Sequence, residues 1–128
     1  MSGARRPAVL VVEDSALVQD ALGVLLEASG YAPSAATTVA DALTALRNER
    51  YDAVLLDLTL PDGDGLEVLS GAQEAGVAAP PTLALTGHDD AATAARCREA
   101  GCAAVLVKPV RRAALMGALR EAGVAPAG

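Results

Sequence analysis

Residues 53–57 have the sequence Ala-Val-Leu-Leu-Asp, an unbroken apolar run that ends in a carboxylate. A continuous apolar run of this length is typical of a central parallel strand that helices cover on both faces. Comparable runs stand at 8–12, 82–85 and 103–107, whereas the weaker, more polar run at 31–36 is typical of an edge strand. The sequence therefore predicts five strands, four of which have the pattern of central strands.

A segment with helical character follows each predicted strand, and these segments cover residues 16–28, 39–48, 65–75, 90–100 and 111–122. Ser15 or Asp14 can cap the first helix, and Gly30, Gly76 and Gly101 stand where helices should stop. Regular alternation of strands and helices predicts an α/β fold of three layers, with a parallel sheet between two layers of helices.

The composition limits the class of protein. With 128 residues and 52% hydrophobic content, the chain suits a single domain over 1–128, with a core at about 7–122 and short flexible termini. No apolar stretch approaches the roughly 20 residues of a membrane span, and no signal peptide is visible, so we expect a cytoplasmic protein that does not bind membranes. The net charge of -6 argues against direct nucleic-acid binding.

The chain has few residues that could bind a soft metal ion such as zinc. Cys97 and Cys102 offer no disulfide framework, and His88 is the only histidine, so a structural zinc site is not expected. We interpret the two cysteines as packing residues.

Polar residues follow four of the predicted strands. In open parallel sheets, ligands bind beyond the carboxyl ends of the strands. The residues that stand there are Glu13-Asp14, Asp57, Thr86-Gly87 and Lys108-Pro109. Lys108 is the only lysine beside nine arginines, and its ammonium is a compact, mobile point charge where a guanidinium is a planar fork.

Three carboxylates at one sheet edge repel one another unless a cation joins them. A site of a few carboxylates that leaves room for water and substrate oxygens suits Mg²⁺ better than Ca²⁺. We assign Asp14 and Asp57 as direct ligands, Glu13 as a ligand through water, and the backbone carbonyl of Thr59 as a further ligand. The alternative for Glu13 and Asp14 is helix capping, since acids favour helix starts.

Asp57 is hard to explain as a structural residue, because an unpaired charge in an apolar segment is costly. A carboxylate can attack phosphorus and form an aspartyl phosphate. Lys108 and the Thr86 hydroxyl would then contact phosphoryl oxygens, so that catalysis would rest on positioning and electrostatics.

The combination resembles the CheY-like receiver domain of response regulators in bacterial two-component signalling. Four motifs in order and at matching spacing carry the resemblance, namely residues 11–14 (Val-Val-Glu-Asp), 55–65 (Leu-Leu-Asp-Leu-Thr-Leu-Pro-Asp-Gly-Asp-Gly), 85–87 (Leu-Thr-Gly) and 107–109 (Val-Lys-Pro). The resemblance implies a flavodoxin-like (βα)5 fold with strand order 2-1-3-4-5. It also implies phosphorylation of Asp57 from a histidine phosphodonor, dependence on Mg²⁺ or its substitute Mn²⁺, and a cis Lys108–Pro109 bond.

The resemblance also assigns roles around the site. In this family phosphorylation draws the threonine hydroxyl inward, and an aromatic residue on the last strand follows it. Val105 stands at that position, so we expect Thr86 and the loop 87–90 to respond while the output surface changes less or differently. Thr59 and His88 lie where the family tunes the lifetime of the phosphoryl group; the alternative is that both are plain solvent-exposed loop residues.

The same resemblance implies two kinds of partner protein, a phosphodonor and an output partner. A sensor histidine kinase or a histidine phosphotransfer protein would donate the phosphoryl group, and exposed Leu17 and Val24 on the helix at 16–28 would form a small apolar patch for it. An output protein or a second receiver would dock on the face built from 90–100, 103–107 and 111–122. Alternatively, the arginines of this face are simply solvated.

Two other functions compete with the receiver. One is a degenerate receiver that acts as an unphosphorylated interaction module, although the complete set of site residues argues against it. The other is a Mg²⁺-dependent phosphatase with Asp57 as nucleophile, but Thr59 stands where such enzymes place a second acid. We therefore expect a signalling domain rather than a turnover enzyme.

Overall fold

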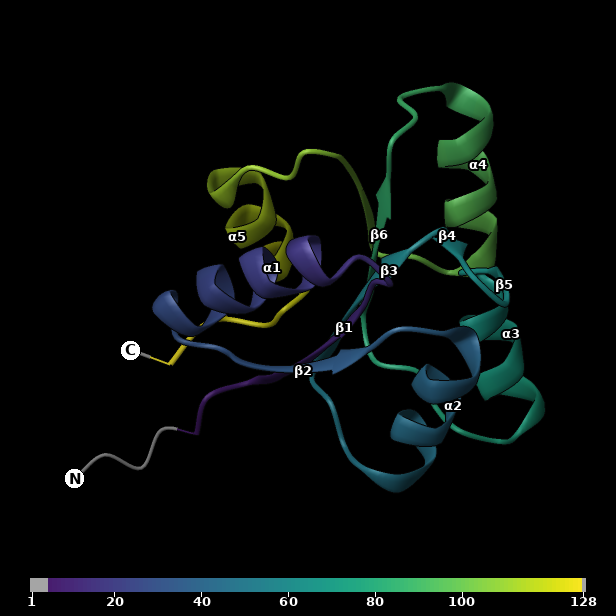
Figure 1. Ribbon diagram of the computed structural model, residues 1–128, viewed down its shortest axis with the longest axis horizontal. Coiled ribbons are helices and arrows are strands. Elements are labelled where there is room, and N and C mark those ends of the chain that lie inside the picture. The colour runs from purple at the N-terminus through teal and green to yellow at the C-terminus, as the bar shows by residue number, and fades with distance from the viewer. Residues whose placement is uncertain (1–4, 128) are drawn as a thin grey trace.

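The computed structural model describes residues 5–127, which form one parallel sheet, a short hairpin and five helices (Figure 1). The strands are β1 (Ala8–Val12), β2 (Ala32–Ala36), β3 (Ala53–Asp57), β4 (Thr59–Leu60), β5 (Gly63–Asp64), β6 (Thr82–Thr86) and β7 (Ala104–Val107). The helices are α1 (Ala16–Ala28), α2 (Val39–Asn48), α3 (Glu67–Glu74), α4 (Ala91–Ala100) and α5 (Arg112–Glu121).

The five long strands are all parallel and run in the order β2-β1-β3-β6-β7. When only these five are counted, this is the predicted order 2-1-3-4-5 of a flavodoxin-like fold, which is confirmed. The hairpin of β4 and β5 forms a separate two-stranded antiparallel sheet.

Helices cover both faces of the sheet, with α1 and α5 on one side and α2 and α3 on the other (Figure 1). Side chains of β1 alternate between the two layers: Val9 and Val11 pack toward α1 and α5, and Leu10 and Val12 pack toward α2 and α3. This two-sided burial explains why the central strands are apolar at every position. The three-layer prediction is confirmed.

One strand prediction was wrong in part. The apolar run at 103–107 has the pattern of a central strand, but β7 lies at the edge of the sheet, where Val105 is half-buried and Val107 is 40% exposed. Both α4 and α5 contact this edge strand, which therefore needs apolar side chains as a central strand does, and a continuous apolar run does not by itself identify a central strand.

In the described part of the chain, the side chain of the N-cap residue caps α1, α2 and α4. Ser15, rather than Asp14, caps α1 through its hydroxyl, which accepts from the backbone N–H of Val18. Thr38 and Asp90 cap α2 and α4 in the same way. Asp14 is therefore free of the capping role that competed with its role as a metal ligand.

The cysteines behave as packing residues. Both are free thiols; Cys97 is buried in α4 and Cys102 is half-buried beyond it. Burial, with a further contribution from Cys97, raises the pKa of Cys102 to about 12, so this thiol stays protonated at neutral pH. Within residues 5–127 no helix combines the length and the hydropathy needed to cross a membrane.

Candidate functional site

The polar residues predicted at the strand ends lie together at the carboxyl edge of the sheet. Glu13 and Asp14 directly follow β1, Asp57 ends β3, Thr86 ends β6 and Lys108 follows β7. Because β1, β3, β6 and β7 are parallel neighbours, their ends meet at the same edge. Glu13, Asp57 and Thr86 are buried, whereas Asp14 is exposed.

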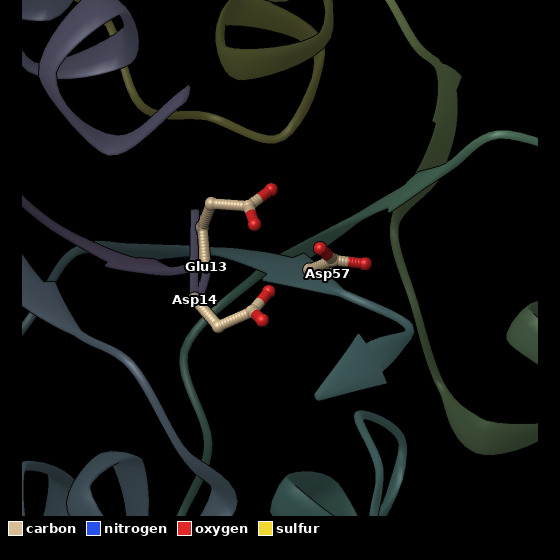
Figure 2. A group of neighbouring side chains, drawn as sticks. All are labelled: Glu13, Asp14 and Asp57. Atoms are coloured by element: carbon tan, nitrogen blue, oxygen red, sulfur yellow. The ribbon is translucent and has the colours of Figure 1, made fainter. Parts of the chain in front are cut away.

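The three carboxylates form one group. Glu13, Asp14 and Asp57 each offer an oxygen, and these oxygens lie within 4.8 Å of one another. Figure 2 shows Glu13 and Asp14 extending from the end of one strand beside Asp57 on the next. Burial, reinforced by the neighbouring carboxylate of Asp57, raises the pKa of Glu13 although its hydrogen bond with Lys108 lowers it. The negative charge is therefore only partly compensated.

The ammonium of Lys108 partly neutralises the negative charge of these carboxylates. Its Nζ donates to Glu13 Oε1 at 2.7 Å and to Asp57 Oδ2 at 2.8 Å. Burial lowers the pKa of Lys108, but the hydrogen bonds to Asp57 and Glu13 outweigh it and raise the pKa above its usual value. The ammonium is thus charged and shared between the two buried carboxylates. Lys108 thus lies where it contacts both Asp57 and Glu13.

The segment after β7 holds this lysine in place. The backbone N–H of Lys108 donates to the Thr86 carbonyl at 2.7 Å, which continues the β6–β7 ladder by one residue. The Lys108–Pro109 peptide bond is cis, as the resemblance implied.

The other oxygen of Asp57 is held by the hairpin. The backbone N–H of Thr59 donates to Asp57 Oδ1 at 2.9 Å, so the two carboxylate oxygens have different partners. The chain then turns through β4 and β5 and returns over Asp57 at Gly65. A Cβ at Gly65 would overlap the Asp57 carbonyl oxygen, so only glycine permits this approach.

The hairpin is tied to two helices. Asp62 accepts from the backbone N–H groups of Val39 at 2.8 Å and Ala40 at 3.1 Å, at the start of α2, and these bonds lower the pKa of Asp62. Asp64 forms an ion pair with Arg96 of α4. These contacts hold the hairpin that follows Asp57 to α2 and to α4.

Thr86 lies beside a surface pocket. Its side chain is buried, and Oγ1 accepts from the backbone N–H of His88 at 3.0 Å. The pocket, of about 330 Å³, is lined by Thr59, Thr86, His88 and Arg96 among others. Gly87 and His88 are exposed. The structure thus brings Thr59, Thr86 and His88 to one opening, while Val105 lies back along β7, opposite Ala84.

Two residues of this region were not singled out from the sequence. Gln19 of α1 donates through Nε2 to the carbonyls of Val11 at 2.7 Å and Ala36 at 3.1 Å, with a longer contact of 3.2 Å to the Glu13 carbonyl. Gln19 thereby holds the end of β1 from which the acids extend. Gly65 is the other: it ends the motif at 55–65, but the sequence analysis gave it no role of its own.

A parallel sheet of this order with three acids and one lysine at its carboxyl edge is the arrangement of a receiver domain. The family model described as the response regulator receiver domain matches residues 9–120, and the chain belongs to this family.

Relatives with curated names agree with this assignment. The polar-differentiation response regulator DivK of Brucella anthropi is 33% identical over 103 residues, which cover 80% of this chain and 84% of DivK. The sensor histidine kinase AruS of Pseudomonas aeruginosa is 37% identical over 133 residues, which cover 96% of this chain and 13% of the kinase. The transcriptional regulatory protein KdpE of Mycobacterium tuberculosis is 33% identical over 114 residues, which cover 89% of this chain and 50% of KdpE. This chain therefore spans half or less of the latter two proteins.

Solved structures have the same fold. A CheY-like response regulator receiver domain protein from Methanospirillum hungatei has a TM-score of 0.81 at 28% identity and covers 91% of this chain and 93% of its own. The chemotaxis protein CheY4 of Vibrio cholerae has a TM-score of 0.84 at 24% identity, with 92% and 99% covered, and supports the fold alone.

Proposed function

We propose that this domain accepts a phosphoryl group on Asp57 from a phosphohistidine and thereby controls a partner protein. The observation that carries the proposal is the ammonium of Lys108 shared by two buried carboxylates at the carboxyl edge of the sheet. A buried charge cluster of this kind is costly to maintain, and it is concentrated where parallel sheets bind ligands.

The transfer uses the contacts already present. One carboxylate oxygen of Asp57 forms the new O–P bond while the N–P bond of the phosphohistidine breaks, and the imidazole nitrogen keeps the electron pair of that bond. Lys108, now 2.8 Å from Asp57 Oδ2, pairs with a phosphoryl oxygen after the transfer. Thr86 uses its hydroxyl as an acceptor for His88 and retains its proton to donate to another phosphoryl oxygen.

The donor set is suited to a hard divalent cation. Three carboxylates lie together with one ammonium, Asp14 among them is exposed, and all available ligand atoms are oxygens. Mg²⁺, or Mn²⁺ in its place, would be held by Asp14 and Asp57 directly, by Glu13 through water and by the Thr59 carbonyl. When bound, the cation would neutralise phosphoryl oxygens during the transfer.

The loop residues would set how long the phosphoryl group survives. Thr59 and His88 line the opening beside Thr86, which supports the proposal that they tune access of water. Because Val105 is a small half-buried residue on the edge strand, we expect switching to act through Thr86 and the loop 87–90 and to move β7 little. Comparison of backbone NMR shifts with and without beryllofluoride tests this, and a large rearrangement of β7 would contradict it.

Partners can reach the site from α1. Leu17 and Val24 are 80% and 68% exposed. Leu17 also lines an apolar groove of about 390 Å³ together with Lys108, Pro109 and Val110. A helix of a sensor histidine kinase or histidine phosphotransfer protein would dock there, and an output protein or second receiver would use the face of α4, β7 and α5. We propose that the domain, as one unit over 1–128, acts in cytoplasmic signalling.

The test is incubation with Mg²⁺ and acetyl phosphate followed by intact mass spectrometry. A labile, stoichiometric phosphoryl adduct that Asp57→Asn abolishes supports the proposal. Rapid multiple turnover of the donor would instead support the phosphatase, and the absence of both would support the unphosphorylated interaction module.

A further inference from the structure

A second polar cavity lies at the amino ends of the strands, away from Asp57. It has a volume of about 510 Å³ and is lined by the segment before β1, the loop before β3, the residue before β6 and the segment after α5. In Figure 1 the segment before β1 and the segment after α5 both run on the side of the molecule away from α4. The length of β3 separates this cavity from Asp57 by roughly 13–17 Å.

The cavity gathers positive charge in an acidic protein. Arg5, Arg6 and Arg50 line it, against the single acid Asp52. The chain as a whole has 16 acidic and 10 basic residues, so three arginines facing one cavity reverse the general trend. Asp52 is also engaged, because its Oδ2 accepts from the backbone N–H of Ala8 at 2.8 Å.

The three arginines differ in how they are held. Arg6 donates through Nη1 to the Glu27 carbonyl in the last turn of α1 at 2.9 Å, and more weakly to the Tyr31 carbonyl beyond that helix at 3.4 Å. A guanidinium has five N–H groups, so this contact orients Arg6 and leaves donors for an anion. Within residues 5–127, Arg5 and Arg50 form no side-chain hydrogen bond or ion pair, so helix capping does not account for them.

We infer that this cavity binds a small anion that carries a diphosphate group. Guanidinium forks bind phosphate oxygens in bidentate fashion, and three forks around one cavity match the several oxygens of a diphosphate better than those of a single carboxylate. Pro7 and Pro81 give the cavity rigid walls. Among the described residues that line it, none is aromatic, so the diphosphate, and not a nucleobase, is the group recognised.

The diphosphate could be free or carried by a nucleotide, and titration with one probe of each kind tests whether the diphosphate itself is the group recognised. Isothermal titration calorimetry with pyrophosphate and with ADP, in EDTA and at low salt, should give saturable binding of both with similar affinity. Binding should weaken as salt is added, because exposed charges are screened. Binding of ADP alone would contradict recognition of the diphosphate, and the absence of saturable binding by either would overturn the inference.

Variants and shift mapping locate the site. Arg50→Gln should weaken pyrophosphate binding by about tenfold because it removes one charged fork. The matched control Arg98→Gln, an exposed arginine of α4, should leave it unchanged. Amide shifts on titration should concentrate at residues 5–8, 50–53 and 122–125. Shifts concentrated around Asp57 and Lys108, or an equal loss of affinity in both variants, would refute the inference and leave the proposed phosphoacceptor untouched.

Discussion

Replacing Lys108 with glutamine should destabilise the domain in a way that depends on pH and on Mg²⁺. The ammonium donates at 2.7 and 2.8 Å to Glu13, which is 1% exposed, and to Asp57, which is 6% exposed. Hydrogen bonds between charged groups contribute about 1.5–3 kcal/mol, and loss of the ammonium leaves two buried carboxylates without an opposite charge. With 28% of the Lys108 side chain exposed, water compensates in part, and we expect a loss of about 2 kcal/mol near neutral pH.

The sign of the pH dependence follows from Glu13. Burial already raises the pKa of Glu13 above 4.5, so the folded state binds its proton more tightly than the unfolded state does. A group of this kind stabilises below its unfolded pKa, and that stability is lost as pH rises through the folded pKa. Without Lys108 the pKa of Glu13 rises further. The cost of Lys108→Gln should therefore be larger at about pH 7.5 than at about pH 5.

Urea denaturation followed by far-ultraviolet circular dichroism measures this cost, with Arg98→Gln as the matched control. Added Mg²⁺ should stabilise the variant more than the parent, because the cation replaces the missing ammonium. Mg²⁺ at a concentration ten times its Kd stabilises the folded state by about 1.4 kcal/mol. An equal cost at both pH values, or a cost no larger than that of Arg98→Gln, would refute the reasoning.

Three further changes test other parts of the site. Gly65→Ala should lower the free energy of unfolding by about 3 kcal/mol, because its Cβ would meet the Asp57 carbonyl, whereas Gly117→Ala in open space on α5 should stabilise by about 0.5–1 kcal/mol in the same urea titration. A mild effect at Gly65 would argue against the close approach. Gln19→Leu should cost about 1–2 kcal/mol by the same assay, since it removes the donor to the carbonyls at the end of β1; no loss would mean that water replaces the amide. Lys108→Arg keeps the charge but should weaken beryllofluoride binding by about tenfold in a fluorescence or NMR titration, because a planar fork replaces a point charge; affinity equal to that of the parent would contradict this role for the only lysine.

Most of the fold could be predicted from the sequence, because each strand is indicated by a short continuous stretch of residues. Apolar runs that end at Glu13, Asp57, Thr86 and Lys108 predict parallel strands, and parallel strands bring their ends to one edge without further knowledge. The position of β7 at the edge could not be predicted from its apolar run, because α4 and α5 both contact this strand and it needs apolar side chains as a central strand does.

The features that the sequence did not yield depend on contacts between distant residues. The hairpin of β4 and β5 has only two residues in each strand, too few for any periodicity. Gln19 looks like an ordinary polar residue of a helix until α1 packs beside the end of β1. The need for glycine at position 65 arises only when the chain returns over Asp57.

The central claim is that Asp57 accepts the phosphoryl group, and chemical trapping at that residue tests it most directly. After incubation with Mg²⁺ and acetyl phosphate, borohydride reduces an aspartyl phosphate to homoserine, which peptide mass mapping can locate. The account predicts homoserine at position 57 in the parent and none in Asp57→Asn. Homoserine at another acid, such as Asp14, or none anywhere in the chain would contradict it.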